Sequence, residues 1–292
     1  MANNSKNICL CIGNFNIKLW SKSDVNIGID FGYSPFIISE IKSKDFTELE
    51  IIPSIPDSLK NEESLVFETN DETKKLWHVC STNDGYKIIV YSPTRPNGIQ
   101  QIALINTQYK VWTIYTEQMS NNTVMPLSYP MGPLIMYYLT TSENAIMIHS
   151  SGIVDGGKGR LFSGFSGVGK STMAGIWQQN GNTTINDDRL LITINDDKVI
   201  MHNTPMFYED EPKSNQLNAI YLLKQTKEHT IRRLNDAEAI SRLLAFCIQH
   251  GYDKTFLEHH LNTVFDIYNR IPIYELGFKL DADVIDFIRS ND

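Results

Sequence analysis

The stretch "GFSGVGKSTMAGIWQQNGNTTINDDRLLI", residues 164–192, decides the fold of the second half of this chain. Its first eight residues match the pattern GxxxxGK[ST], in which a glycine-rich turn leads into a helix. Glycines let backbone N–H groups turn inward and surround an anion, and the N-terminus of the following helix adds its positive dipole end. The stretch therefore predicts a phosphate-binding loop followed by a helix.

The members of this loop have separate expected roles. We expect Lys170 to reach the β- and γ-phosphates of ATP and Ser171 to hold Mg²⁺. The "GRLFSG" run, residues 159–164, fits a strand before the loop, and Asn180-Gly181 fit the end of the helix after it. The residues expected to contact the nucleotide are Gly164, Ser166, Gly167, Val168, Gly169, Lys170, Ser171 and Thr172.

Two adjacent aspartates, Asp187 and Asp188, follow a short β-prone run after this helix. In a right-handed strand–helix–strand crossover, both parallel strands end at the same sheet edge, so the carboxylates are expected beside the phosphates. One would lie on the Mg²⁺ side, and the other would take the proton from an attacking hydroxyl or orient it. We favour Asp188 as the base and Asp187 as the metal-side residue. The reverse assignment stays open, and acidic turns at strand ends are otherwise simply solvated.

His149 precedes the loop on a predicted hairpin. The runs "MIHSSGIV" and "GRLFSG" flank the turn "DGGKG", residues 155–159. With Val154 opposite Arg160, His149 falls opposite Phe165, at the mouth of the loop. We expect His149 to steady a phosphate or to hydrogen-bond the aspartate pair, although a lone histidine on an apolar strand is more often structural.

The chain changes character after about residue 122. Residues 1–122 are rich in β-branched and aromatic runs, and Asp84-Gly85 is typical of a hairpin turn. From the polar segment 118–130 onwards, strands and helices alternate, beginning with a predicted helix at 131–141. Asn235 and Glu238 have capping-box spacing at the start of a later helix. We expect a β-rich N-terminal domain over 1–122 and an α/β domain with the phosphate loop over 123–292.

Composition narrows the class of protein. The 292 residues carry a formal net charge of -8, which argues against a broad nucleic-acid surface. No run approaches the roughly 20 apolar residues of a membrane span, and no signal peptide is visible. The four cysteines form no CxxC pair, which is typical of a reducing compartment. We therefore expect a cytoplasmic protein with no membrane or nucleic-acid partner.

Residues 147–192, read as one unit, resemble the HPr kinase/phosphorylase family. That family also shows a histidine at a strand end, a short hairpin, GxSGxGKS, one helix and an Asp-Asp pair. ATP-dependent phosphoenolpyruvate carboxykinases share its nucleotide-binding core. The resemblance implies a carboxykinase-like domain with a mixed β-sheet and flanking helices. It also implies that His149, Lys170, Asp187 and Asp188 are active-site residues. Members usually carry glutamate directly after the loop serine, where this chain has Thr172.

The expected function is an ATP- and Mg²⁺-dependent serine kinase acting on a hydroxyl of a peptide or protein. The N-terminal domain would recruit this acceptor or mediate self-association into a homo-oligomer. Two alternatives remain: a small-molecule hydroxyl kinase on the same core, and a nucleotide-binding regulatory protein that transfers no phosphate. The complete set of Lys170, Ser171, Asp187 and Asp188 favours an enzyme.

Overall fold

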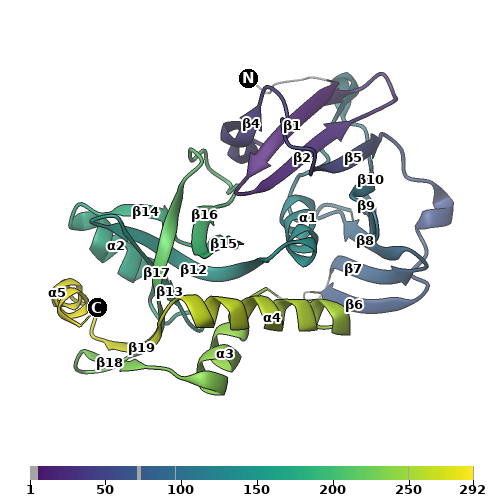
Figure 1. Cartoon of the computed structure of the whole chain (residues 1–292). Helices are drawn as coiled ribbons and strands as arrows, with labels where there is room; N and C mark the ends of the chain where they lie inside the picture. Colours follow the sequence, from purple (N-terminus) through teal and green to yellow (C-terminus); the bar gives the residue numbers. More distant parts are fainter. Residues whose placement is uncertain (1–5, 71–73, 96, 249, 292) are drawn as a thin grey trace. The chain divides into compact units, whose positions relative to one another are not determined.

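The computed structural model describes residues 6–70, 74–95, 97–248 and 250–291. The chain forms two compact units, Met1–Tyr138 with Pro205–Glu211, and Leu139–Thr204 with Pro212–Asp292 (Figure 1). This division differs from the expected boundary between residues 122 and 123. The boundary falls later because helix α1 (Met131–Leu139) belongs to the first unit up to Tyr138, whose ring packs against Tyr86 with 5.8 Å between ring centroids.

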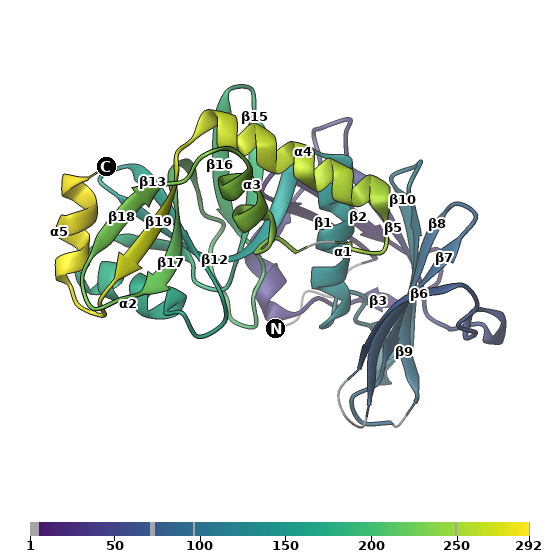
Figure 2. The same cartoon turned by 90° about the horizontal axis from the view of Figure 1, so that it is seen from below.

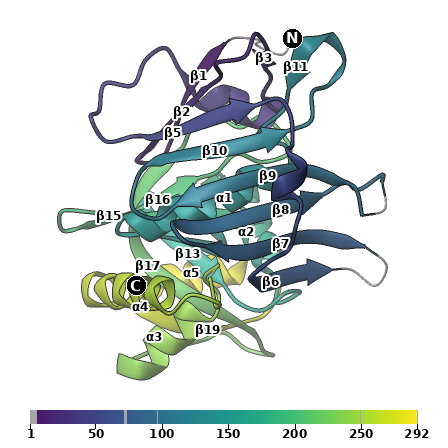
Figure 3. The same ribbon diagram turned by 90° about the vertical axis from the view of Figure 1, so that its right-hand side faces the viewer.

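Runs rich in β-branched and aromatic residues build a nine-stranded sheet in the first unit. Its order is β4-β1-β2-β5-β10-β9-β8-β7-β6, and Figure 3 shows several of these strands side by side. The β2–β5 and β5–β10 pairs are parallel, and the other described pairs are antiparallel. The strands are β1 (Asn7–Ile12), β2 (Phe15–Trp20), β4 (Ile37–Ile38), β5 (Thr47–Ile52), β6 (Leu65–Asn70), β7 (Lys75–Thr82), β8 (Gly85–Tyr91), β9 (Ile99–Asn106) and β10 (Val111–Thr116). A separate parallel pair joins β3 (Asn26–Ile27) to β11 (Thr123–Val124).

The predicted hairpin at Asp84-Gly85 is confirmed, because β7 and β8 are antiparallel and Thr82 pairs with Gly85. Helix α1 covers one face of the sheet near β8. On another part of the sheet, buried Cys80, Ile89 and Ile102 pack with side chains from the segment after β5. Both kinds of contact remove apolar surface from water, which stabilises the unit.

The second unit is a mixed α/β structure built on eight strands. The strands are β12 (Ala145–Asp155), β13 (Lys158–Ser163), β14 (Thr183–Asn186), β15 (Arg189–Asn195), β16 (Lys198–Asn203), β17 (Ser214–Gln225), β18 (Thr230–Arg233) and β19 (Ile273–Phe278). The helices are α2 (Lys170–Gln179), α3 (Asp236–Leu244), α4 (Lys254–Arg270) and α5 (Asp283–Ser290). Strand β12 pairs antiparallel with β13, β14 and β15, so β13 and β14 run parallel to each other on either side of it.

Helices cover both faces of these strands, as can be followed in Figure 2. Helix α2, through Met173 and Trp177, packs with α5 on one face. Helices α3 and α4 contribute Leu243 and Val264 to the other. The expected helices after residues 131, 170 and 235 are all present. None of the helices within the described residues is long and apolar enough to cross a lipid bilayer.

The predicted capping box at the start of α3 is wrong in its side-chain detail. Asn235 is the N-cap residue, but its side chain makes no capping hydrogen bond. Glu238 turns instead to Arg232, whose two terminal nitrogens donate to the carboxylate at 2.9 and 2.7 Å. A bidentate hydrogen bond to a guanidinium is stronger than one to a backbone amide, so Glu238 binds Arg232 instead of capping the helix.

Candidate functional site

The phosphate loop joins the end of β13 to the start of α2. Gly167 and Gly169 have φ angles of 78° and 107°, which side-chain-bearing L-residues rarely adopt. Gly169 is the N-cap of α2, so the first N–H groups of the helix have no partner within it. The loop backbone and the helix N-terminus together form the kind of site that binds phosphate.

Lys170 lies across this loop rather than in solvent. The residue is 7% exposed, and its Nζ donates to the carbonyl oxygens of Gly164 and Phe165 at 3.0 and 3.1 Å. Burial lowers the pKa of Lys170, and the nearby carboxylate of Asp188 partly offsets that shift. The ammonium is therefore held inside the loop, and the negative charge of Asp188 favours its protonated form.

The remaining loop residues divide between exposed and anchored positions. Ser166, Ser171 and Thr172 are exposed. Val168 is half-buried, and its carbonyl accepts a hydrogen bond from Gln225 Nε2 at 3.2 Å. Since Gln225 ends β17, this bond fixes the loop to the central part of the sheet.

The aspartate turn is fixed to the same strand as the start of α2. Asn186 Oδ1 accepts from the backbone N–H of Asp188 at 2.9 Å, which shapes the turn. The backbone N–H of Ser150 donates to the Asp188 carbonyl at 3.1 Å. Ser151 Oγ donates to the Lys170 carbonyl at 3.1 Å. Consecutive residues of β12 therefore hold both the aspartate turn and the first helical turn of α2.

The two aspartates have different surroundings. One oxygen of Asp188, Oδ1, lies 3.7 Å from His149 Nε2, and the other, Oδ2, accepts from Arg189 Nε at 2.9 Å. The half-buried carboxylate of Asp187 makes no hydrogen bond or ion pair with the part of the chain that the structure describes. The structure thus brings His149, Lys170 and Asp188 together and leaves Asp187 open beside them.

His149 reaches this site by a register that differs from the prediction. Ile153, not Val154, pairs with Arg160, and Asp155 pairs with Lys158 around a tight Gly156-Gly157 turn. His149 therefore precedes the Ser150–Ser163 pair, and its carbonyl accepts from Ser163 Oγ at 2.8 Å.

Burial and nearby charged groups shift the pKa of the His149 imidazole. Burial lowers the pKa of His149, and the charges of Lys170 and Arg189 lower it further, while Asp188 opposes them. The imidazole, whose side chain is 53% exposed, is therefore shifted towards its uncharged form. It can exchange hydrogen bonds with a neighbour without adding a positive charge to the site.

An aromatic pair, of which one ring is exposed, is joined to the phosphate loop and to the strand of His149. Phe165, inside the phosphate loop, is 76% exposed, and its ring meets Phe246 edge to face with 5.2 Å between centroids. The Phe246 carbonyl accepts the backbone N–H of His149 at 3.2 Å, so this phenylalanine is tied to the strand that carries the histidine.

Three contributors to the site were missed in the sequence. Arg189 directly follows the aspartate pair, and its position next to a strand-end carboxylate was an available signal. Gln225 and Phe246 are distant in sequence, and only the folded chain brings them to the loop. Among the described residues, no group of three or more His, Cys, Asp or Glu side chains is arranged to hold a metal ion alone.

No protein family and no curated protein matches this sequence. Among solved structures, the chain is similar to the one described as the Hpr(Ser) kinase/phosphatase from Coxiella burnetii. The similarity spans 50% of this chain and 94% of that chain, with 10% sequence identity and a TM-score of 0.31. Similarity at this level assigns neither fold nor function, so a functional assignment has to rest on the residues and their geometry.

Proposed function

We propose that this chain is an ATP- and Mg²⁺-dependent kinase that phosphorylates a serine hydroxyl of a peptide or protein, on a carboxykinase-like nucleotide-binding core. One observation carries the proposal: Ser150 and Ser151, consecutive residues of β12, bind the carbonyls of Asp188 and Lys170, so the carboxylate beside His149 belongs to the same site as the loop lysine. A phosphate-binding ammonium and a candidate base thus share one site. The resemblance of residues 147–192 to the HPr kinase/phosphorylase family favours the same reaction.

Lys170 is the residue proposed to bind the nucleotide phosphates. Its ammonium now donates to two neutral carbonyl oxygens. Phosphate oxygens are charged and are therefore stronger acceptors, so they can replace the carbonyls without drawing the ammonium out of the loop. Their negative charge also favours the protonated form of this buried lysine.

Asp188 is the proposed base. As the serine oxygen forms its bond to the γ-phosphorus, the bond from that phosphorus to the β,γ-bridging oxygen breaks, and ADP leaves with the electron pair. The hydroxyl proton passes to the Asp188 carboxylate. Arg189 holds Oδ2, which leaves Oδ1, on the side of His149, for the hydroxyl. The neutral imidazole then acts as a positioning group for this carboxylate.

Two side chains at the site are suitable ligands for the implied Mg²⁺. Mg²⁺ in phosphoryl-transfer sites takes only one or two carboxylates and completes its shell with water and phosphate oxygens. Asp187 offers a carboxylate with no partner in the described chain, and Ser171 offers an exposed hydroxyl in the first turn of α2. Bound there, Mg²⁺ would neutralise charge that develops on the phosphates.

The aromatic pair favours a peptide over a small polar acceptor. Phe165 presents a mostly exposed ring in the phosphate loop, supported by Phe246, whose carbonyl accepts the backbone N–H of His149. An apolar side chain flanking the serine would cover this ring and remove it from water, which a small polar molecule would not do.

The experiment measures transfer of label from γ-labelled ATP to an array of serine peptides in the presence of Mg²⁺. Asp188→Asn is expected to lower transfer by about 10²- to 10⁴-fold, as loss of a general base does, while ATP affinity is kept. Lys170→Ala is expected to lower ATP affinity itself. Asp187→Asn should raise the Mg²⁺ concentration needed for half-maximal rate.

The chain supplies a matched control. Asp196-Asp197 is a second aspartate pair in the same unit, exposed in the turn between β15 and β16. Asp197→Asn makes the same chemical change away from the site and should transfer at the wild-type rate. Wild-type transfer by Asp188→Asn would refute the mechanism, and unchanged ATP affinity in Lys170→Ala would refute the nucleotide site.

A further inference from the structure

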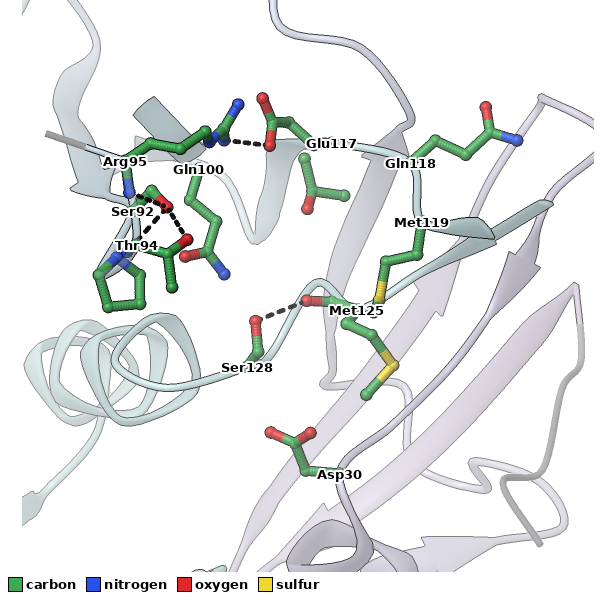
Figure 4. A pocket seen from close by; sticks show the side chains of 12 residues that line it. Asp30, Ser92, Thr94, Arg95, Gln100, Glu117, Gln118, Met119, Met125 and Ser128 are labelled. Carbon is green, nitrogen blue, oxygen red and sulfur yellow. Dashed lines mark hydrogen bonds and ion pairs between the residues drawn. The ribbon is translucent and has the colours of Figure 1, made fainter. Parts of the chain in front are cut away.

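The first unit contains a hollow that the proposed reaction does not use. It has a volume of about 470 Å³ and lies where β9 begins and β10 ends, next to the segments that carry Asp30 and Met125 (Figure 4). This volume falls within the range of small-ligand sites, about 300–1,000 Å³.

The charges around the hollow do not balance. Arg95 is paired with Glu117 on one side, so these two charges compensate each other. Asp30 lies on the opposite side, as Figure 4 shows. It occupies the N-cap position of a short 3₁₀ helix (Phe31–Phe36), yet its side chain does not cap that helix. One negative charge is therefore left over.

Asp30 is a half-buried carboxylate whose own chain does not satisfy it. Its carboxylate makes no hydrogen bond or ion pair within the residues that the structure describes, although its backbone carbonyl accepts from Tyr33 N–H at 2.8 Å. Burial raises its pKa, and no neighbouring cation opposes that shift. A cation that reaches a carboxylate in this state binds favourably, because the cation compensates for the hydration that the carboxylate has lost.

The remaining lining suits a cation on an aliphatic stem. Met119 and Met125 bring thioether side chains to the hollow. Methionine is flexible and polarisable and packs against methylene groups of varied shape. Gln100 adds an amide, and Ser128, whose hydroxyl donates to the Met125 carbonyl at 3.0 Å, keeps its oxygen lone pairs for a donor.

We propose that this hollow binds an aliphatic ammonium group, with Asp30 as its counter-charge and the two methionines around its methylene stem. The group can come from a lysine side chain in a peptide or from a free alkylamine. A second hollow of about 870 Å³ shares Arg95, Glu117 and Gln118 with the first, so residues flanking a bound lysine have room beside it. The site does not depend on the proposed kinase activity.

The test is calorimetric titration of the full chain with three probes. These are a blocked pentapeptide with a central lysine, the same peptide with that lysine acetylated, and pentylamine. Saturable binding of the lysine peptide or of pentylamine, with at least tenfold weaker binding of the acetylated peptide, is expected from a charge-assisted hydrogen bond of about 1.5–3 kcal/mol. Tighter binding of the peptide than of pentylamine would assign the source to a polypeptide.

Two further measurements test whether Asp30 binds the ammonium group. Asp30→Asn should weaken lysine-peptide binding about tenfold or more, while Asp84→Asn, the same change in the exposed β7–β8 turn of this unit, should not alter it. In the unaltered chain, affinity should fall as pH falls through the pKa of Asp30. Equal binding of both peptides, unchanged affinity in Asp30→Asn, or no saturable binding of any probe would overturn the proposal.

Discussion

Replacing Gly169 by alanine tests the geometry on which the phosphate loop depends. Gly169 has φ 107° and ψ 26°, a conformation that costs a residue with a Cβ about 1–3 kcal/mol. The added Cβ would also lie 3.0 Å from Cζ of Phe278. That ring is fully buried and cannot move aside without repacking the core, which costs about a further 1–3 kcal/mol. The expected destabilisation is therefore about 2–6 kcal/mol.

Two other glycines serve as matched controls. A Cβ at Gly167, φ 78°, would meet nothing within 4 Å, so Gly167→Ala should show the backbone cost alone, about 1–3 kcal/mol. Gly175 lies inside α2 with equally open space around it. Gly175→Ala should stabilise the unit by about 1 kcal/mol, because alanine favours a helix interior more than glycine does.

Urea unfolding followed by fluorescence measures these differences, because Trp177, buried in α2, is the only tryptophan in the sequence of the second unit. ATP affinity is measured in parallel. It should fall in both loop variants and stay unchanged in Gly175→Ala. A Gly169→Ala protein that unfolds at the wild-type urea concentration would refute the assigned loop conformation.

Three more predictions concern other parts of the chain. Burial raises the pKa of Asp30, so the carboxyl supports the folded state while it is protonated at low pH, and this contribution is lost as the pH rises and the group ionises. Asp30→Asn should therefore raise Tm at pH 7 but not at pH 3. Burial lowers the pKa of His202 and His260 to about 4, so the second unit should lose on the order of 3 kcal/mol per histidine between about pH 6.5 and 4. His260→Phe should remove one such loss in urea titrations. Phe246→Ala should raise KM for a peptide acceptor about fivefold to tenfold with kcat kept; a fall in kcat alone would contradict the acceptor-side placement.

Sequence reasoning predicted the elements of the second unit better than their register. The strand, loop, helix and second strand over residues 159–186 were all expected. The register error came from centring "DGGKG" on its middle residue. Gly156 and Gly157 both have positive φ, which is the signature of a two-residue hairpin turn closed by Asp155 and Lys158. Reading that glycine pair as the whole turn would have given the observed pairing.

The candidate site was foreseen where neighbours in sequence determine it. The aspartate pair is close to the loop because one helix separates two strands that flank β12. The contributions of Gln225 and Phe246 were not foreseeable, since they depend on where β17 ends and on how the chain continues after α3. The hollow at Asp30 could not be predicted from the sequence either, because only folding brings Asp30, Arg95 and Met125 together.

The connection between β16 and β17 has a consequence for dissecting the molecule. The chain leaves the second unit at Pro205 and re-enters it at Pro212, and the segment between them belongs to the first unit. The fit is close, because a Cβ on Gly32 would overlap the Met206 carbonyl at 1.7 Å. Three covalent crossings therefore join the units, and a single proteolytic cut cannot release either one intact. A cut at residue 138 would leave the segment Pro205–Glu211 of the first unit on the fragment that carries the second unit, so the two units must be expressed and engineered as one chain.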